Sequence, residues 1–531
     1  MQAQNDLYNA RRSDGTHYDY LFIGSGNAAL TCASLLASKG YRICMLEAHD
    51  LPGGYAHTFK MGGYHFCAQV HYIWGCGEGG RIYEFLKHIG LDEEITFELF
   101  DPDGYDHMIM PDGKRVTIPY GWDALQENIA SAYPESTGLD RFFDLVKSLR
   151  EEMARLPRKI RWWDVALKGW LFYPNLMRFR HATVQDLFDH CDVSVEARTV
   201  LTAQAGDLLL PRERLSCLFY IGLLGGYGSG AYAPSEFFKG YIDRLVAFIQ
   251  SRGGDLYLEE KVTAISSSGR TINGVTTISG KTFSADHYIC NMDPQAAAHM
   301  IGWDKFKPSE QKLLQYEYSD NGIVVYLGLK PGFTPGNYDI GNYNTWHCLD
   351  WDMNEMWRAC DRLDLERGWF FLSTPTLHSA ASGMAPEGCH TLEIATYLPY
   401  QLFREAADQS YAEYHALKMQ LADRLIDLVV KHHIPDLRDH IAVKVVGSPV
   451  TSEDFCYAPF GNAYGSAMTP KNTTTRLGAE TSFSNLSWCN ASSGSPGIYG
   501  TVMTGMELYM DLTDDVFFPL DRLPATSKND N

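Results

Sequence analysis

The stretch that decides the fold is Tyr18-Asp19-Tyr20-Leu21-Phe22-Ile23-Gly24-Ser25-Gly26-Asn27-Ala28-Ala29. It opens with an apolar run typical of a short strand, and the glycines after that run indicate a tight turn. Leu30 to Lys39 then show helical spacing of apolar residues, and Tyr41 to Leu46 read as a second strand that ends in Glu47. This order predicts a βαβ unit at the start of an α/β domain.

The glycine spacing within this unit predicts a dinucleotide site. Gly24 permits the tight turn, Gly26 lets the backbone approach a pyrophosphate at the positive end of the helix, and Ala29 keeps helix and strand close. Glu47, at the end of the next strand, is expected to accept hydrogen bonds from a ribose. The alternative is a glycine turn in an unrelated α/β protein, which the full strand, helix and acidic residue argue against.

The residues after Glu47 favour a flavin over a nicotinamide. Leu51-Pro52-Gly53-Gly54 and His57-Thr58-Phe59 follow directly, and a glycine pair here lets the chain double back along the cofactor. A nicotinamide-only domain would instead continue into another helix and strand. A second glycine run, Gly226 to Ala231, follows no βαβ opening and precedes Pro234, so we expect a loop there and no separate NADPH domain.

Composition limits the class of protein. The 531 residues include 45 basic and 65 acidic side chains, a net charge of -20, and 45% hydrophobic residues. These values are typical of a soluble protein of more than one domain and argue against disorder, coiled coil and nucleic acid as a partner. The 12 cysteines form no C-x-x-C pair, which favours buried thiols in a reducing compartment.

Metal and hydrolase chemistry find no support in the sequence. The 18 histidines form no H-x-H or H-E-x-x-H group, and His432-His433 reads as the end of a helix. No metal is predicted. The chain also lacks a G-x-S-x-G elbow, which argues against a hydrolase.

One segment departs from the acidic balance. Residues 155–181 hold seven basic side chains against one acid, +6 locally and -26 elsewhere, with Trp, Tyr and Phe interleaved. This composition suits a segment lying in a membrane interface; the alternative is a helical cap whose tryptophans pack inward. No transmembrane helix is predicted, and polar residues 1–17 read as a disordered lead-in rather than a secretory signal. We expect a cytoplasmic protein, free or attached to a membrane surface.

In the glycine turn, the glycine pair at Gly53-Gly54 and several later blocks, the chain resembles the phytoene desaturase, carotenoid isomerase and retinol saturase group of FAD-dependent oxidoreductases, with retinol saturase-like members closest. The resemblance spans about Tyr18 to Leu512. The blocks that carry it are Gly53 to Phe59, His71 to Gly75, Gly253-Gly254 with Val262, Ala285-Asp286 with Asn291 to Pro294, Gly447 to Thr451, Pro459 to Gly465 and Ser495 to Gly500.

The chain departs from this group at four places. Tyr55 stands where many relatives carry an arginine, and Cys67 where they carry an aspartate. Where relatives have a glycine pair after a Tyr-x-Pro, this chain reads Tyr232-Ala233-Pro234-Ser235-Glu236. Where their C-terminal block usually offers a carboxylate near the cofactor, it reads Cys489-Asn490-Ala491-Ser492.

The resemblance implies an architecture and a set of cofactor contacts. The implied fold is α/β, a Rossmann-type FAD-binding domain (18–100, 232–300 and 475–516) interleaved with an α+β substrate domain (101–231 and 301–474), as in flavin amine oxidases. FAD is the predicted cofactor. Beyond Gly24, Gly26, Ala29 and Glu47, its implied contacts are Asn27, Ala28, Ala48, Gly53, Gly54, His57, Thr58, Val262, Asn291, Ser492, Gly497, Ile498 and Tyr499.

The implied chemistry acts on carbon-carbon double bonds of an apolar polyene or isoprenoid, by hydride transfer with the flavin. Reduction, desaturation and isomerisation all stay open. His71 and Tyr72 are the hypothesised catalytic residues, because a histidine can act as acid or base near pH 7 and a tyrosine can donate to a developing charge. The alternative for this pair is a packed wall. The alternative functions are an amine oxidase and a non-catalytic binding protein on the same fold, as in Rab escort-type relatives.

Overall fold

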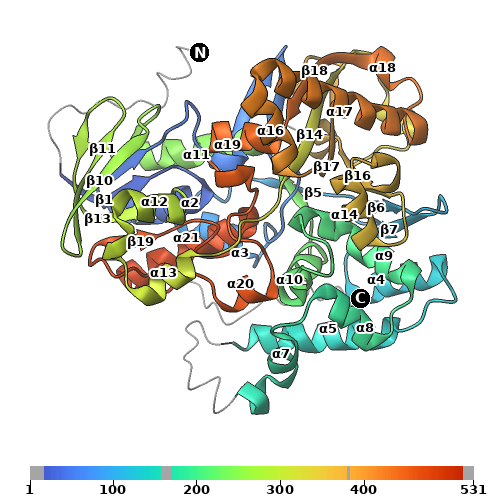
Figure 1. The fold of residues 1–531 in the computed structure, drawn as a ribbon, viewed down its shortest axis with the longest axis horizontal. Coiled ribbons are helices and arrows are strands. Elements are labelled where there is room, and N and C mark those ends of the chain that lie inside the picture. Colours follow the sequence, from blue (N-terminus) through green and yellow to red (C-terminus); the bar gives the residue numbers. More distant parts are fainter. Residues whose placement is uncertain (1–16, 157–168, 380–382, 518–531) are drawn as a thin grey trace.

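The computed structural model describes residues 17–156, 169–379 and 383–517, so the expected lead-in falls outside it except for His17. Figure 1 shows two main sheets, one near each side of the molecule, with a helical layer beneath the second. Neither sheet is built from one continuous stretch of chain. Each sheet therefore depends on contacts between segments distant in sequence.

The first sheet is parallel throughout, in the order β19-β13-β1-β2-β9. Phe22 of β1 pairs with Met45 on one side and Ile289 on the other, and it is fully buried. Apolar runs of this kind are typical of strands covered on both faces. The strands are β1 (Tyr18–Ile23), β2 (Ile43–Leu46), β9 (Asp255–Tyr257), β13 (Ala285–Cys290) and β19 (Leu486–Trp488).

Helices pack closely on this sheet. Helix α2 (Asn27–Ser38) follows β1 and contacts both α11 (Phe237–Ser251) and α21 (Gly497–Thr513). The α2–α21 contact needs a glycine, because a Cβ at Gly505 would lie 2.6 Å from the carbonyl oxygen of Ala28. The same half of the molecule holds α3 (Arg81–Ile89), α12 (Pro294–Ile301), α13 (Pro308–Leu314) and the small sheet of β10 (Val262–Ser268), β11 (Thr271–Thr277) and β12 (Thr282–Phe283). The hairpin of β3 (Thr58–Met61) and β4 (Tyr64–Cys67) instead packs against the second sheet.

The second sheet has seven strands in the order β18-β14-β17-β16-β15-β6-β7. Every residue of β14 is buried. All pairs are antiparallel except β15 with β6, which is parallel. The strands are β6 (Asp106–Ile109), β7 (Arg115–Ile118), β14 (Gly322–Leu329), β15 (Asn344–Cys348), β16 (Trp369–Ser373), β17 (His390–Tyr397) and β18 (Ile441–Gly447).

Two groups of helices cover this second sheet. Helix α17 (Tyr411–His432) lies across β14 and β18 and shares a core with them, with α16 (Tyr400–Gln409) beside it. The other group shares a core with β6, β7 and β15 and occupies the lower part of Figure 1. Its helices are α4 (Trp122–Ala132), α5 (Leu139–Ala154), α7 (Pro174–Phe179), α8 (Val184–Cys191), α9 (Val195–Ala203), η2 (Gln204–Leu208), α10 (Cys217–Tyr227) and α14 (Met353–Asp361).

The predicted fold class is confirmed, with local differences. Helix α2 begins at Asn27 rather than Leu30, because the glycine turn leads directly into it. The expected loop at 226–231 is wrong at its start, since Gly226 and Tyr227 belong to α10. The helix carries a glycine at position 226 because the Trp74 indole packs there, and a Cβ would lie 2.6 Å from that ring.

Three further expectations concern cysteines, metals and membrane spans. All 12 cysteines are free, and all but Cys456 are buried. Within the described ranges, no group of three His, Cys, Asp or Glu side chains could hold a metal ion. No helix in the described part of the chain has the length and apolar character needed to span a membrane.

Candidate active site

The parallel strands of the first sheet end at one edge, and a cavity opens there. The residues just beyond these strand ends include Gly24 after β1, Glu47 after β2, Asn291 after β13 and Asn490 after β19, and all four line the cavity. Ligands bind at this edge in open parallel sheets, since loops and helix N-termini gather there. The cavity has a volume of about 770 Å³ and reaches the second sheet.

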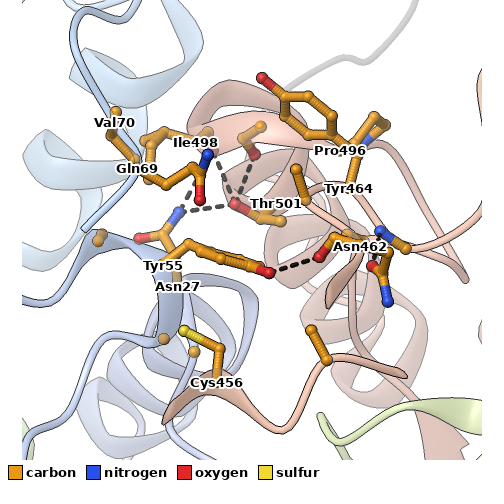
Figure 2. A pocket seen from close by; sticks show the side chains of 18 of the residues that line it. Asn27, Tyr55, Gln69, Val70, Cys456, Asn462, Tyr464, Pro496, Ile498 and Thr501 are labelled. Carbon is orange, nitrogen blue, oxygen red and sulfur yellow. Dashed lines mark hydrogen bonds between the residues drawn. The ribbon is translucent and has the colours of Figure 1, made fainter. Parts of the chain in front are cut away.

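Two helix N-termini meet at this edge, those of α2 and α21. Neither helix has a side-chain cap or an acidic residue in its first turn, so its first amides stay available to a ligand. The Asn27 side-chain amide ties the two ends together by donating to Thr501 Oγ1 (2.9 Å) and to the Ile498 carbonyl (3.2 Å), as Figure 2 shows. Such an arrangement fits a pyrophosphate group.

Asn291 fixes the glycine turn against the C-terminal part of the chain. Its side-chain oxygen accepts a hydrogen bond from the Gly26 amide (2.8 Å), and its amide nitrogen donates to the Cys489 carbonyl (2.5 Å). A Cβ at Gly26 would lie 2.6 Å from the same Asn291 oxygen. Gly26 therefore has no room for a side chain.

Glu47 lies where a ribose is expected. Its carboxylate accepts hydrogen bonds from the Ser25 amide (2.8 Å), the Ser25 hydroxyl (2.6 Å) and the His49 amide (2.9 Å). These bonds hold the carboxylate at the rim of the glycine turn. Close by, burial lowers the pKa of His57 to about 4, so its ring is neutral and Nδ1 donates to the Gly54 carbonyl (2.6 Å).

Most residues predicted to contact the cofactor line this cavity. Ala29 does not, because it packs in the core between α2 and the first sheet, and Thr58 lies beside a small separate hollow near Pro52. Those that line the cavity are Gly24, Gly26, Asn27, Ala28, Glu47, Ala48, Gly53, Gly54, His57, Val262, Asn291, Ser492, Gly497, Ile498 and Tyr499.

Two of the four departures from the family pattern, at Tyr55 and in the block that holds Asn490, have structural roles. Tyr55 reaches across the cavity in Figure 2, and its hydroxyl donates to the carbonyl of Asn462. Asn490 stands in the block where a carboxylate was expected. Its side-chain oxygen accepts from the amides of Ser492 (3.1 Å) and Ser493 (3.0 Å), and its nitrogen donates to the Met292 carbonyl (3.2 Å). The Asn490 side chain thus stabilises the turn that follows it and connects this turn to Met292.

The far part of the cavity is walled by apolar side chains. They come from η2 and the residue after it, from α10 and from the second sheet, and all are leucines or aromatic residues. The set is Leu208, Leu209, Leu223, Trp346, Trp369 and Phe371. Such walls with few polar groups are typical of sites for apolar ligands.

His71 and Tyr72, the hypothesised catalytic pair, both line this cavity. His71 Nδ1 lies 2.8 Å from Oε2 of Glu393, a fully buried carboxyl whose pKa is raised by burial. The Tyr72 hydroxyl donates to Asp106 Oδ2 (3.0 Å), and its ring stacks on Tyr227 with centroids 4.1 Å apart. His71 presents its ring to the cavity, whereas the Tyr72 hydroxyl is engaged with protein.

Sequence reasoning missed several cavity residues. Asp207 of η2 is the most informative, because it is a carboxyl within an apolar wall. In the sequence, Asp207 is a single acidic residue before the run Leu208-Leu209-Leu210, and it belongs to no motif that would have indicated a functional role. Trp346 and Trp369 come from strands β15 and β16, and only the sheet pairing places them together.

The glycine turn, the paired helix ends and the glycine pair at Gly53 and Gly54 together form a dinucleotide cradle beside an apolar chamber. A model of the flavin-containing amine oxidoreductase family matches residues 29–406, more than half of the chain. The chain belongs to this family. Membership places it among flavin-dependent enzymes, and flavin is the cofactor that the cradle fits.

Curated relatives confirm the resemblance drawn from the sequence. The chain is 23% identical to an all-trans-retinol 13,14-reductase of Danio rerio, over 84% of this chain and 77% of that protein. It is 25% identical to a chloroplastic prolycopene isomerase 2 of an Oncidium hybrid cultivar, over 83% and 74% of the two chains. Among solved structures, a putrescine oxidase variant has the same fold, with a TM-score of 0.64 at 14% identity over 94% of this chain and 99% of that one.

Proposed function

We propose that this protein is an FAD-dependent enzyme that acts on carbon-carbon double bonds of an apolar polyene or isoprenoid. The observation that carries the proposal is the apolar chamber walled by Trp346, Trp369 and Phe371, which is continuous with the dinucleotide cradle. A long hydrocarbon chain lying there would be desolvated on all sides. The names of the curated relatives, a retinol reductase and prolycopene isomerases, support the same substrate class.

FAD rather than a shorter flavin is favoured by the adenosine end of the cradle. The pyrophosphate would lie at Gly26 and the ends of α2 and α21, and Glu47 would accept from the ribose beyond it. When bound, the flavin supplies hydride chemistry. The protein's own residues orient the substrate, exclude water and hold protons at His71 and its neighbours.

The experiment has two parts. Denaturing the purified protein and identifying the released flavin by chromatography is expected to yield FAD, and release of FMN or of no flavin would count against the cofactor. The reduced and oxidised enzyme is then incubated anaerobically with all-trans-retinol and with cis-lycopene, and products are identified by mass and ultraviolet spectra. Putrescine and cyclohexylamine with oxygen serve as the comparison. Peroxide formation from an amine, without conversion of either polyene, would favour an amine oxidase.

We also propose that the protein contacts a membrane surface through the described part of the basic aromatic segment. Residues 157–168 of that segment lie outside the described residues. Beside them, Trp170, Leu171 and Phe172 are exposed by 63%, 75% and 55%, and Arg178 and Arg180 follow within the next turns. Consecutive exposed apolar side chains near basic groups suit an interface with anionic lipid. A substrate dissolved in a membrane would enter the enzyme from such a surface.

A further inference from the structure

Asp207 is a carboxyl next to the apolar part of the cavity wall. It lies on η2 between Gly206 and Leu208, and all three line the cavity. The wall is tightly packed here, because a Cβ on Gly206 would lie 2.5 Å from the indole of Trp346. Asp207 Oδ2 is buried and has no hydrogen-bond partner among the described residues. A polar atom left in this state is costly, and a ligand or a proton would satisfy it.

A second carboxyl lies behind the first. Asp106 of β6 is fully buried and accepts hydrogen bonds from the Tyr72 hydroxyl (3.0 Å) and the Gln204 amide (3.1 Å). Burial, and then the charge of Asp207, raise the pKa of Asp106 well above its usual range. Two neighbouring carboxyls away from water cannot both ionise at neutral pH, so the pair retains at least one proton.

The proton of Asp207 is poised for exchange. Burial raises the pKa of Asp207 to about 7, against the effects of Tyr72 and His71, which lower it. An acid or base is most effective when its pKa lies near the working pH. The titratable groups that face Asp207 from the elements around it are His71, Tyr72, Asp106, Tyr227 and Tyr464.

We propose that Asp207 is the catalytic residue that transfers the proton to or from the substrate's double-bond carbons, with Tyr72 and Asp106 as positioning residues. The proposal rests on the proposed function. In reduction, the O–H bond of Asp207 breaks and a C–H bond forms at one alkene carbon with the π electron pair. Bound reduced flavin would supply the hydride that the adjacent carbon needs, and the Asp207 carboxylate regains a proton from solvent. Desaturation runs the same step in reverse.

The test compares wild type with Asp207→Asn and Asp207→Glu in single-turnover reduction of all-trans-retinol by the dithionite-reduced holoenzyme. The wild-type rate is expected to fall as pH rises through about 7, because the acid must be protonated. Asp207→Asn should be slower by about 100-fold or more and lose this pH dependence, with its flavin spectrum retained. Asp207→Glu should keep activity with a shifted midpoint. In D2O the wild-type product should carry two solvent deuterium atoms, because dithionite supplies only electrons and both added hydrogens come from solvent.

Asp320→Asn is the matched control. Asp320 is a partly buried carboxyl whose pKa is raised to about 6 by burial, and it does not line the cavity. The single-turnover rate of this variant should have the same pH midpoint as that of wild type. A readout without substrate is the part of the protonated-carboxyl infrared absorption that titrates near pH 7, which should be lost in Asp207→Asn but not in Asp320→Asn. The absorption of Asp106, whose pKa is higher, should remain in both variants.

Different results separate the two proposals. A wild-type enzyme that converts no polyene overturns the proposed function and this inference with it. If wild type converts the polyene while Asp207→Asn keeps a rate within threefold and the same pH midpoint, only the role of Asp207 is overturned. If Asp207→Asn loses its flavin, the Asp207→Glu variant decides. A shift in the pH midpoint of its single-turnover rate supports proton transfer by Asp207, and an unchanged pH midpoint overturns it.

Discussion

At Gly26 two requirements meet in one residue. The backbone must come close to a bound anion, and the Asn291 side chain occupies the space where a Cβ would lie. Asn291 in turn holds the Cys489 carbonyl, so one side chain joins the glycine turn to the C-terminal block. Local strain at this position would spread to both ends of the cofactor cradle.

Gly26→Ala is therefore expected to lose most of its flavin. The new methyl group would lie 2.6 Å from Asn291 Oδ1, and relieving that contact would displace the glycine turn of the proposed cofactor cradle. The measurement is the ratio of flavin to protein absorbance after purification. Gly222→Ala in α10 is the control, since nothing lies within 4 Å of its added Cβ. A Gly26→Ala protein with full flavin content would contradict the assigned role.

His71→Gln is expected to lower turnover at least about tenfold while flavin absorbance stays intact. The glutamine amide can still donate to Glu393, so the buried carboxyl keeps a partner, but it cannot change its protonation state. His65→Gln on β4 serves as the control, because His65 bonds the Gly383 carbonyl and does not line the cavity. Unchanged turnover in His71→Gln would remove the residue from the mechanism.

Asp207 also makes stability depend on pH. Its folded pKa, about 7, lies above the usual value of a carboxyl, so the folded state holds the proton more tightly than the unfolded state. Its contribution is fully present below about pH 4 and is lost as pH rises through about 7. Asp207→Asn should therefore melt at a higher temperature than wild type at pH 8, with the difference shrinking toward pH 5. An equal difference at both pH values would contradict a titrating Asp207.

How far single residues can be predicted depends on whether their role is local. Gly24, Gly26 and Glu47 were recognisable because the turn and the following strand fix their spacing. Asp207 was not, because its environment is made by β6, β15 and the loop before Tyr72, all distant in sequence. Its chemistry comes from that environment rather than from any motif.

At the scale of elements, strongly apolar or helical stretches were predictable and short polar strands were not. Strand β14 is apolar along its whole length, and helix α17 has leucines at helical spacing, so the local sequence favours each element. Strands β6, β7 and β15 were missed, since each has only four or five residues with polar side chains among them. Their pairing, including the parallel β6–β15 contact, stabilises them instead.

The segment at residues 169–172 gives an element-scale prediction. Replacing Trp170, Leu171 and Phe172 with serine should lower binding to phosphatidylcholine vesicles that contain phosphatidylserine by at least about tenfold. Burying each such side chain in an apolar phase is worth about 1.5–3 kcal/mol, and tenfold in affinity is about 1.4 kcal/mol. Flotation of the vesicles measures the bound fraction, and raised salt should weaken it.

Tyr411→Ser is the control for that variant. Tyr411 is the first residue of α17 and is exposed by 76%, so its removal changes surface hydrophobicity elsewhere. It should float as wild type does. Wild-type protein that binds neither neutral nor anionic vesicles would defeat the membrane proposal, and equal flotation of the triple variant would place the contact elsewhere.

At the scale of the whole molecule, the cofactor cradle joins segments from the two ends of the chain. Strand β1 and helix α2 come from the N-terminal part, and β19 and α21 from the C-terminal part, yet α2 and α21 pack directly together. The sequence indicated the βαβ unit, and only the family resemblance implied that residues near 490 return to it. Sheet order follows from contacts that no local pattern encodes.

In the proposed complex the flavin bridges these ends, so flavin removal should loosen them together. Flavin at 100 times its dissociation constant adds about 2.7 kcal/mol to the folded state, so the apoprotein should melt at a lower temperature and recover on adding FAD. Hydrogen exchange should rise in α2 and α21 on flavin removal, since we propose that the pyrophosphate lies at their uncapped N-termini. Helix α17 does not line the cavity, and its exchange should change little. Faster exchange in α17 with α2 unchanged would mean that the cofactor is held elsewhere.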